Sequence, residues 1–292
     1  PHDSVSQFHP DGTAVSPDAT GTGPGETGGY IVGGLDWPQG TVSDPDGNIW
    51  VANCEGNSVT YLPEGDPYGA VEPADLGLRK PLDIAFDLDG NVYVTGTESD
   101  NVAFLAPDGT PRREPLTGSF RRPMGIAANS DGEMWVSNSR LIDLPCPTKE
   151  VVNEGDPSVA FIDGDQNVTE FFGGGLFIPW GIAVDGNDNV WVANFGQKRL
   201  SGFCGVDASA ACPSGAGRGT PLAEDGYPFD GLVRSTGVAI DTAGNVWLTN
   251  NWKETPFPTN PGGYQVVVYV GLAGPVQPPA PVERPVKPTP PA

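Results

Sequence analysis

One sequence motif recurs five times along this chain and constrains its fold more than any other feature. The clearest copy, at residues 178–194, has two short β-branched runs on either side of an Asp/Gly/Asn cluster. Runs this short suit strands, and the polar cluster between them is typical of a tight turn, so each copy predicts a β-hairpin. The other copies lie at 37–53, 80–96, 122–138 and 235–250.

The spacing of the copies identifies the kind of repeat. Their turn centres are about 42 residues apart, apart from two insertions, which is the length of a propeller blade and longer than an ankyrin or leucine-rich repeat. A third alternating run follows each hairpin, and a weaker fourth follows in places, as at 168–172. Four antiparallel strands per repeat, with no helical pattern between repeats, predict an all-β propeller of four-stranded antiparallel blades.

The first residues of the chain repeat only part of this pattern. Residues 4–13 match the third run of the second copy, 101–110, so the chain opens in the middle of a blade. We therefore expect 1–29 to be the outer half of an incomplete blade with its connector, 30–273 to be five blades, and 274–292 to be a Pro-rich extended tail. Six blades are expected, with the missing strands upstream, and a five-bladed ring is the alternative. A missing hairpin leaves strand edges that invite pairing with another chain.

The wording of the repeat resembles a known group of propellers. The pattern P-x-G-I-A-V-D-x-x-G-N-V-W-V-A-N, followed by N-x-V, resembles NHL-repeat propellers and the streptogramin (virginiamycin B) lyase-like propellers over residues 4–272. The resemblance implies the propeller fold. It does not by itself imply an activity, because this repeat serves enzymes, receptors and scaffolds alike.

Cysteine content and charge indicate where such a protein works. Cys204 and Cys212 bracket a short small-residue loop and are expected to form a disulfide, and Cys54 and Cys146 form a second candidate pair. Disulfides favour a secreted protein, extracellular or periplasmic, with free thiols as the alternative. The net charge of −22 argues against nucleic acid as a partner. No apolar run approaches the length of a membrane span.

Propeller topology separates the charged loops into two faces. Loops after second and fourth strands share one face, which collects most of the basic residues and several tryptophans, whereas the hairpin turns on the other face are rich in Asp. A protein partner, or an anionic or carbohydrate ligand, is therefore predicted on the basic face, by stacking and charge. The alternative is loop charge paired with neighbouring acids. The candidate binding residues are Trp37, Gln39, Arg79, Lys80, Asp83, Arg121, Arg122, Trp180, Arg234, Thr236 and Trp252.

An enzymatic interpretation finds little support in the residues. The metal site of gluconolactonase-type propellers uses the middle position of the P-x-G motifs, and here these positions are Gln39, Leu82, Met124, Trp180 and Thr236. None is a carboxylate, and Asp83 is displaced by one position. Streptogramin lyases use a histidine at the mouth, whereas His2 and His9 both lie in the N-terminal half-blade. The general acid or base of an elimination is therefore not matched.

These observations predict a secreted, non-catalytic binding or scaffolding propeller at the cell surface or in an extracellular assembly. Neither a catalytic residue nor a cofactor is predicted. The alternative is an atypical lyase or lactonase-like hydrolase using Asp83, Gln39 and Thr236. The turns that begin at Asp44 and Asp87 resemble the opening of a calcium loop, but they lead directly into strands, so hairpin chemistry explains them better than calcium binding. Weak calcium binding by the acidic turns is the remaining cofactor alternative.

Overall fold

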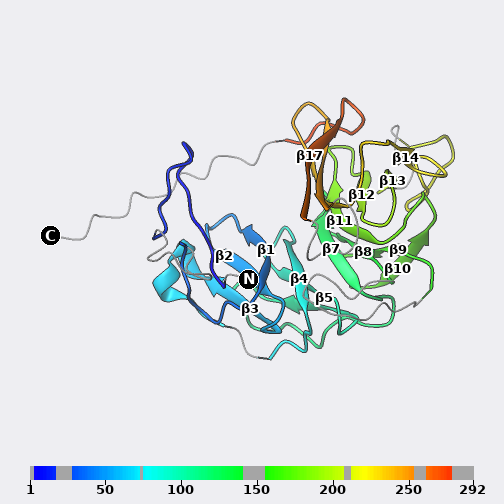
Figure 1. The fold of residues 1–292 in the computed structure, drawn as a ribbon. Coiled ribbons are helices and arrows are strands. Elements are labelled where there is room, and N and C mark those ends of the chain that lie inside the picture. The colour runs from blue at the N-terminus through cyan, green and yellow to red at the C-terminus, as the bar shows by residue number, and fades with distance from the viewer. Residues whose placement is uncertain are drawn as a thin grey trace.

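The computed structural model describes residues 3–17, 28–72, 75–140, 155–206, 212–252 and 261–277. Its strands form five antiparallel sheets in chain order, which we number as blades one to five (Figure 1). The all-β propeller architecture expected from the repeat is confirmed. No helix in the described residues is long and apolar enough to cross a membrane.

The blades have three or four regular strands each. Blade one contains β1 (Pro38–Ser43), β2 (Ile49–Asn53) and β3 (Ser58–Leu62), and blade two contains β4 (Pro81–Phe86), β5 (Val92–Gly96) and β6 (Asn101–Leu105). Blade three contains β7 (Pro123–Ala128), β8 (Met134–Asn138), β9 (Ser158–Ile162) and β10 (Val168–Phe172). Blade four contains β11 (Pro179–Val184), β12 (Val190–Asn194), β13 (Arg199–Phe203) and β14 (Tyr227–Pro228). Blade five contains β15 (Ser235–Ile240), β16 (Val246–Trp252) and β17 (Pro261–Tyr269).

The fourth strand is regular only in blades three and four. In blades one and two it is reduced to single bridges, Tyr61 to Val71 and Val102 to Leu116. Two short 3-10 turns, η1 (Pro63–Gly65) and η2 (Pro67–Gly69), follow β3. The expected fourth strand is therefore regular in two blades and a single bridge in two others, whereas blade five has three strands among the described residues.

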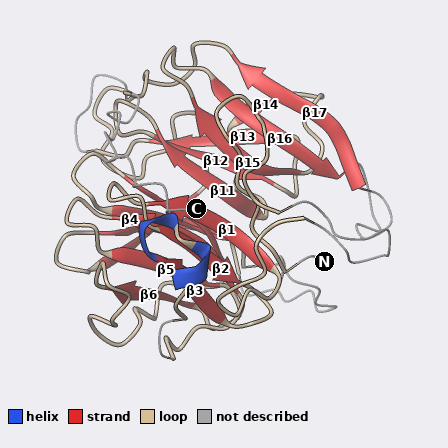
Figure 2. Ribbon diagram, turned by 90° about the vertical axis from the view of Figure 1, so that its left-hand side faces the viewer, coloured by secondary structure: helices blue, strands red, loops and turns tan. Residues whose placement is uncertain are grey.

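Every inner strand carries a bulge directly after its first residue. In blade four, for example, pairing with β12 shifts between Pro179 and Ile182. The glycines at the bulge let neighbouring inner strands approach closely: a Cβ on Gly181 would lie 2.4 Å from the carbonyl oxygen of Thr236 in the next blade. Neighbouring inner strands pack in the order β1, β4, β7, β11, β15. Figure 2 labels four of them, β1, β4, β11 and β15. The P-x-G motif therefore builds the axis of the propeller.

The Asp residues of the hairpin turns are structural. Asp185 Oδ1 accepts the backbone N–H groups of Asn187 and Asn189, each at 2.9 Å, and its Oδ2 accepts Trp191 Nε1 at 2.9 Å. Asp241 makes the same contacts in blade five, and these hydrogen bonds lower its pKa to about 2. No cluster of three metal-ligating His, Cys, Asp or Glu side chains occurs among the described residues. Calcium binding by these turns stays an untested expectation.

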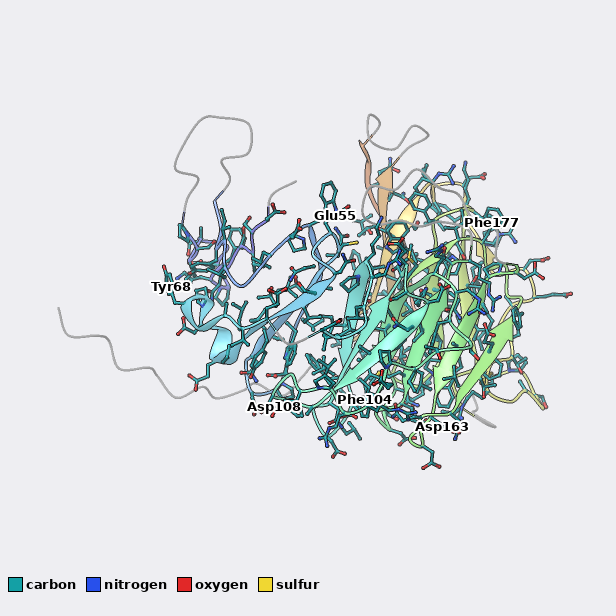
Figure 3. All side chains as sticks on the ribbon, turned by 90° about the horizontal axis from the view of Figure 1, so that it is seen from below. Glu55, Tyr68, Phe104, Asp108, Asp163 and Phe177 are labelled. Carbon is teal, nitrogen blue, oxygen red and sulfur yellow. A yellow bond between two sulfur atoms is a disulfide. The ribbon has the colours of Figure 1, made fainter. Side chains whose placement is uncertain are left out.

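The two faces of the propeller are visible in Figure 3. Glu55 and Phe177, from the loops at one end of the blades, lie on one side, and Asp108 and Asp163, from turns at the other end, lie on the opposite side. These two sets of loops thus occupy opposite ends of the strands, as the repeat predicts.

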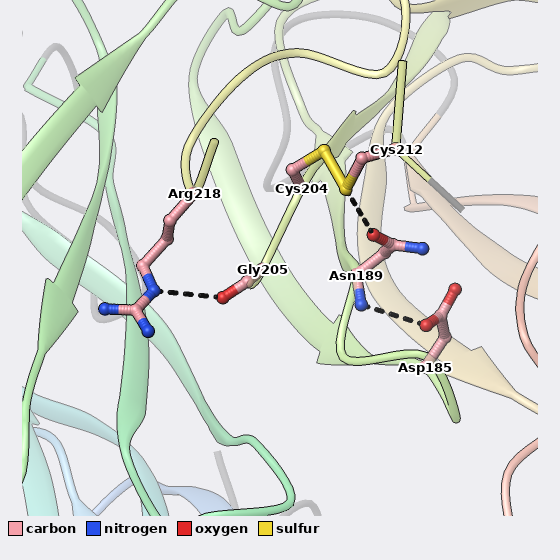
Figure 4. The surroundings of a disulfide bond; sticks show 6 residues. All are labelled: Asp185, Asn189, Cys204, Gly205, Cys212 and Arg218. Atoms are coloured by element: carbon pink, nitrogen blue, oxygen red, sulfur yellow. Dashed lines mark hydrogen bonds between the residues drawn. A yellow bond between two sulfur atoms is a disulfide. The ribbon is translucent and has the colours of Figure 1, made fainter. Parts of the chain in front are cut away.

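The predicted disulfide between Cys204 and Cys212 is confirmed, with Cα atoms 5.6 Å apart. It links the residue directly after β13 to Cys212, whose Sγ is 3.6 Å from Asn189 Oδ1 in the hairpin turn of blade four (Figure 4). Cys54 is disulfide-bonded as well. Cys146, its expected partner, lies outside the described residues.

The N-terminal segment has the geometry of the third and fourth strands of a blade. His9 N donates to the carbonyl of Thr13 at 2.8 Å, as Ala106 N does to Thr110 in blade two. Val5 bridges Tyr30 in the same way that Val102 bridges Leu116. We call residues 3–17 and 28–32 the half-blade. It packs beside blade one through Val5 and Val32.

The blades form an arc rather than a closed ring. Each inner strand packs on the next from β1 to β15, but β15 and β1 do not pack together in this way. The N-terminal segment and β17 stand at opposite ends of the arc (Figure 1). Among the described residues, the half-blade therefore has no inner pair of strands.

Candidate functional site

A cavity of about 380 Å³ lies on the propeller axis, where the five inner strands converge. Every blade contributes to its wall through the P-x-G bulge or the residue after it. The lining residues are Gln39, Gly40, Leu82, Asp83, Gly125, Trp180, Gly181, Ile182, Thr236, Gly237 and Val238. Four predicted binding residues, Gln39, Asp83, Trp180 and Thr236, are thus brought together.

Among the described residues, Asp83 is the only ionisable one in the wall of this cavity. It stands where blades one, three, four and five have the bulge glycine. Its Oδ1 accepts the N–H of Ile84 at 3.0 Å, and its Oδ2 accepts the N–H of Ile126 in blade three at 3.1 Å. The carboxylate therefore joins two blades as well as facing the cavity.

Burial controls the proton affinity of Asp83. Part of its surface reaches the cavity, but the carboxyl lies deep among the inner strands, and desolvation disfavours its charged form. Desolvation raises the pKa to about 6 despite the two N–H donors, which act in the opposite direction. Asp83 therefore changes charge in mildly acidic solution, where an ordinary aspartate is already ionised.

Trp180 borders the cavity while most of its surface is packed. Its exposed fraction is 8%, and its ring lies 5.1 Å from that of Phe195. With Leu82, Met124 and Ile178 these two rings form an apolar cluster beside the axis. The sequence predicts a stacking residue here, whereas the structure leaves little of Trp180 exposed to a ligand.

Hydroxyl groups next to the cavity fasten neighbouring blades together. Thr95 Oγ1 accepts the N–H of Asp83 at 3.1 Å and donates to the carbonyl of Met124 in the next blade at 2.7 Å. Ser137 accepts the N–H of Gly125 and donates to the carbonyl of Trp180 at 2.5 Å. These residues are not among the predicted site residues, although a hydroxyl recurs at the same position of three blades, at 95, 137 and 249.

The remaining predicted residues lie around the rim and not in the cavity wall. Arg79 pairs with Glu98, an acid of a neighbouring loop. Arg121 Nη1 donates to the carbonyl of Phe120 at 2.6 Å. Arg234 Nη1 donates to the carbonyl of Phe195, and its guanidinium lies 5.5 Å from that ring. Each of these three cations is thus engaged with a partner of its own.

A recurrent contact, which we call the latch, holds the start of each of the first three inner strands. The residue before the strand has a positive φ, 51° at Trp37, 49° at Lys80 and 50° at Arg122. Its N–H donates to a side chain of the preceding unit: Lys80 to Asn57 at 2.9 Å, and Arg122 to Asp100 at 2.8 Å. These rim residues thus have a structural role at the blade boundaries. The side chain of Trp252 lies outside the described residues.

Comparison with known proteins identifies the fold. No protein-family model and no curated protein sequence matches the chain. A streptogramin B lyase structure is 16% identical, with a TM-score of 0.55, over 87% of this chain and 72% of its own. A putative gluconolactonase is 14% identical, with a TM-score of 0.58, over 84% and 78%. A nidogen/laminin complex is 16% identical, with a TM-score of 0.55, over 75% and 73%. At this identity the likeness shows a shared propeller fold.

Proposed function

We propose that this chain, which has the fold of these lyase, gluconolactonase and nidogen/laminin propellers, is a non-catalytic binding module. Its ligand enters the axial cavity and is held at the basic rim. The observation that carries the proposal is the convergence of Gln39, Asp83, Trp180 and Thr236 on one cavity from four different blades. Cavities with a few converging polar groups are the usual places for ligands.

The chemistry of the cavity and rim favours a ligand with both polar and flat apolar parts. The amide of Gln39 and the hydroxyl of Thr236 can hydrogen-bond a carbohydrate, and the indole edge of Trp180 adds an apolar contact. The rim cations, Lys80 and Arg122 among them, attract an anionic group of a ligand or of a partner protein. Disulfides support a secreted protein that works at the cell surface or in an extracellular assembly.

The test is calorimetric titration with a panel of neutral and anionic oligosaccharides at two salt concentrations. We expect saturable binding that falls about tenfold in Trp180→Ala and, for anionic probes, in Arg122→Ala. Arg113→Ala, an exposed cation away from the cavity, is the matched control and should leave binding unchanged. Binding that is indifferent to both rim and cavity variants would exclude this surface as the site.

A second candidate is a lyase or lactonase-like hydrolase. It is favoured by Asp83, whose raised pKa would suit a general base in the cavity, and by the names of similar structures, which include a streptogramin B lyase and a gluconolactonase. The test is turnover of lactones and esters with and without divalent ions. Activity that is lost in Asp83→Asn and follows a single ionisation near pH 6 would favour the enzyme over the binding module.

A further inference from the structure

The carboxyl of Asp83 is an isolated charge near the axis of the propeller. It stands where the other blades have a glycine, and Gly40 leaves room for it, because a Cβ on Gly40 would lie 3.0 Å from Asp83 Oδ1. The strands that pack against β4 are β1, β2, β5 and β7. Their one titratable side chain is Tyr93, whose hydroxyl accepts a hydrogen bond from Gln166. These strands therefore present no cation to Asp83.

Hydrogen bonding within the protein leaves part of this carboxyl open to a ligand. An ionised carboxylate accepts roughly four hydrogen bonds. Asp83 uses one acceptor position on each oxygen, for the N–H groups of Ile84 and Ile126. Its pKa is raised by desolvation, without a contribution from a neighbouring charge. At neutral pH the carboxylate therefore carries a negative charge that no described residue neutralises.

Two further polar side chains of the cavity wall have unused hydrogen-bonding groups. Neither the amide of Gln39 nor the hydroxyl of Thr236 has a hydrogen-bond partner within the described chain. Both side chains are half-buried, and polar groups in such places are normally satisfied by water or by a ligand. Water can serve the amide and the hydroxyl, but it does not neutralise the carboxylate.

An ammonium group matches the carboxylate best. It brings a positive charge and three N–H donors, and it has no acceptor. Pairing of opposite charges is stronger at a buried position than at the surface, where water screens both groups. The net charge of −22 also attracts cationic ligands to the protein. The amide and the hydroxyl can each donate and accept, as sugar hydroxyls do, so the remainder of the ligand is expected to be a polyol.

We propose that the axial cavity binds an amino sugar, whose ammonium group pairs with Asp83 and whose hydroxyls bond to Gln39 and Thr236. This inference rests on the proposed binding function and names the ligand class of the same cavity. The exposed part of Trp180 contacts the C–H groups of the sugar ring. The cavity volume of about 380 Å³ lies within the range of small-molecule sites.

The test is calorimetric titration of the full chain with glucosamine, N-acetylglucosamine and glucose, which differ in one substituent. We expect glucosamine to bind about tenfold or more tightly than the other two sugars at pH 7. Asp83→Asn should remove this preference, because the amide keeps the shape of the side chain without its charge. Asp46→Asn, at an exposed carboxylate in the hairpin turn of blade one, is the matched control and should keep it.

The pH dependence provides a second measurement, on the unaltered protein. The affinity for glucosamine should rise about tenfold from pH 5 to pH 7, because Asp83, whose pKa is about 6, ionises over this range. At pH 6 binding should release about half a proton per molecule, measured as the change of the binding heat with the buffer. Neither effect is expected for N-acetylglucosamine, or for glucosamine with Asp83→Asn.

Three results would overturn the inference. Equal affinity for the three sugars, still reduced by Trp180→Ala, would leave the binding module in place and exclude its preference for an amine. Binding of ethylamine as tight as that of glucosamine would exclude a sugar as the preferred ligand. Failure of these sugars and of every oligosaccharide in the panel to bind would overturn the proposed function, and this inference with it.

Discussion

Trp191 and Trp247 occupy the same position in consecutive blades and make the same hydrogen bond, yet their environments differ. Each indole donates to the Asp of its own turn at 2.9 Å. Trp191 is 1% exposed because blade five covers it, and Trp247 is 42% exposed because no described blade follows. The repeat thus specifies each hairpin locally, while burial of its aromatic residue depends on the next blade.

The largest expected effect is the difference in stability between alanine variants of these two tryptophans. Trp191→Ala should lower the free energy of unfolding by about 3–5 kcal/mol, since it opens a cavity at a packed boundary. Trp247→Ala should cost about 1 kcal/mol, because a partly exposed side chain loses less buried area. Urea denaturation of both variants measures the difference. Equal costs would mean that the face of blade five is covered in solution.

Because of Asp83, the free energy of unfolding of the blades should depend on pH. Its pKa is raised to about 6, so the folded chain holds a proton that the unfolded chain releases near pH 4. The free energy of unfolding should therefore fall as the pH rises from about 4 to 6, by up to about 3 kcal/mol. Asp83→Asn should flatten this part of the profile in urea titrations at successive pH values. An unchanged slope would assign the dependence to other carboxyls.

Removing the latch should have a smaller effect on stability, and a different one at a complete blade boundary than at the boundary with the half-blade. Asp100→Ala removes the acceptor for Arg122 N and should cost about 1–2 kcal/mol in global stability. Asp3→Ala removes the same acceptor for Trp37 N, but the half-blade is braced on one side only. Its loss should therefore appear as faster hydrogen exchange at Trp37 with little change in the unfolding midpoint.

The smallest effect is expected in blade three, where the sequence of the hairpin turn differs from that of the other blades. Position 129 is Asn where other turns have Asp, and Trp135 Nε1 has no hydrogen-bond partner among the described residues. Asn129→Asp combined with Glu133→Asn recreates the usual turn and should stabilise the protein by about 1 kcal/mol. Asn129→Asp alone should gain less, because it places a second carboxylate beside Glu133. Thermal unfolding of both variants measures the gain.

The fold was readable from the sequence because each hairpin carries its own turn chemistry and the repeat shows how often it recurs. The core aromatics at positions 50, 93, 135 and 191 were predictable for the same reason. The exposure of Trp247 was not, because burial there depends on a neighbour and not on local pattern. Four predicted site residues share a cavity because they occupy bulge positions, which the repeat aligns.

The electrostatics of the rim could be predicted only in part. The sequence predicts basic residues on one face. It could not show that Arg79 is paired with Glu98, or that Arg234 donates a hydrogen bond to the carbonyl of Phe195. The raised pKa of Asp83 could not be predicted either, because it results from burial of the carboxyl among the inner strands. Spatial pairing and desolvation are properties of the assembled blades, whereas the position of a charge on a loop is a property of the repeat.

The open arc affects how the molecule unfolds. A closed propeller has no terminal blade, so that losing any blade breaks two boundaries at once. In an arc the last blade is held by one boundary, as in linear repeat arrays, where stability is close to a sum of units and nearest-neighbour contacts. Blade five is therefore expected to detach before the interior blades, as a separate cooperative unit. If a neighbouring segment covered Trp247, blade five would gain a second boundary and should unfold together with the other blades.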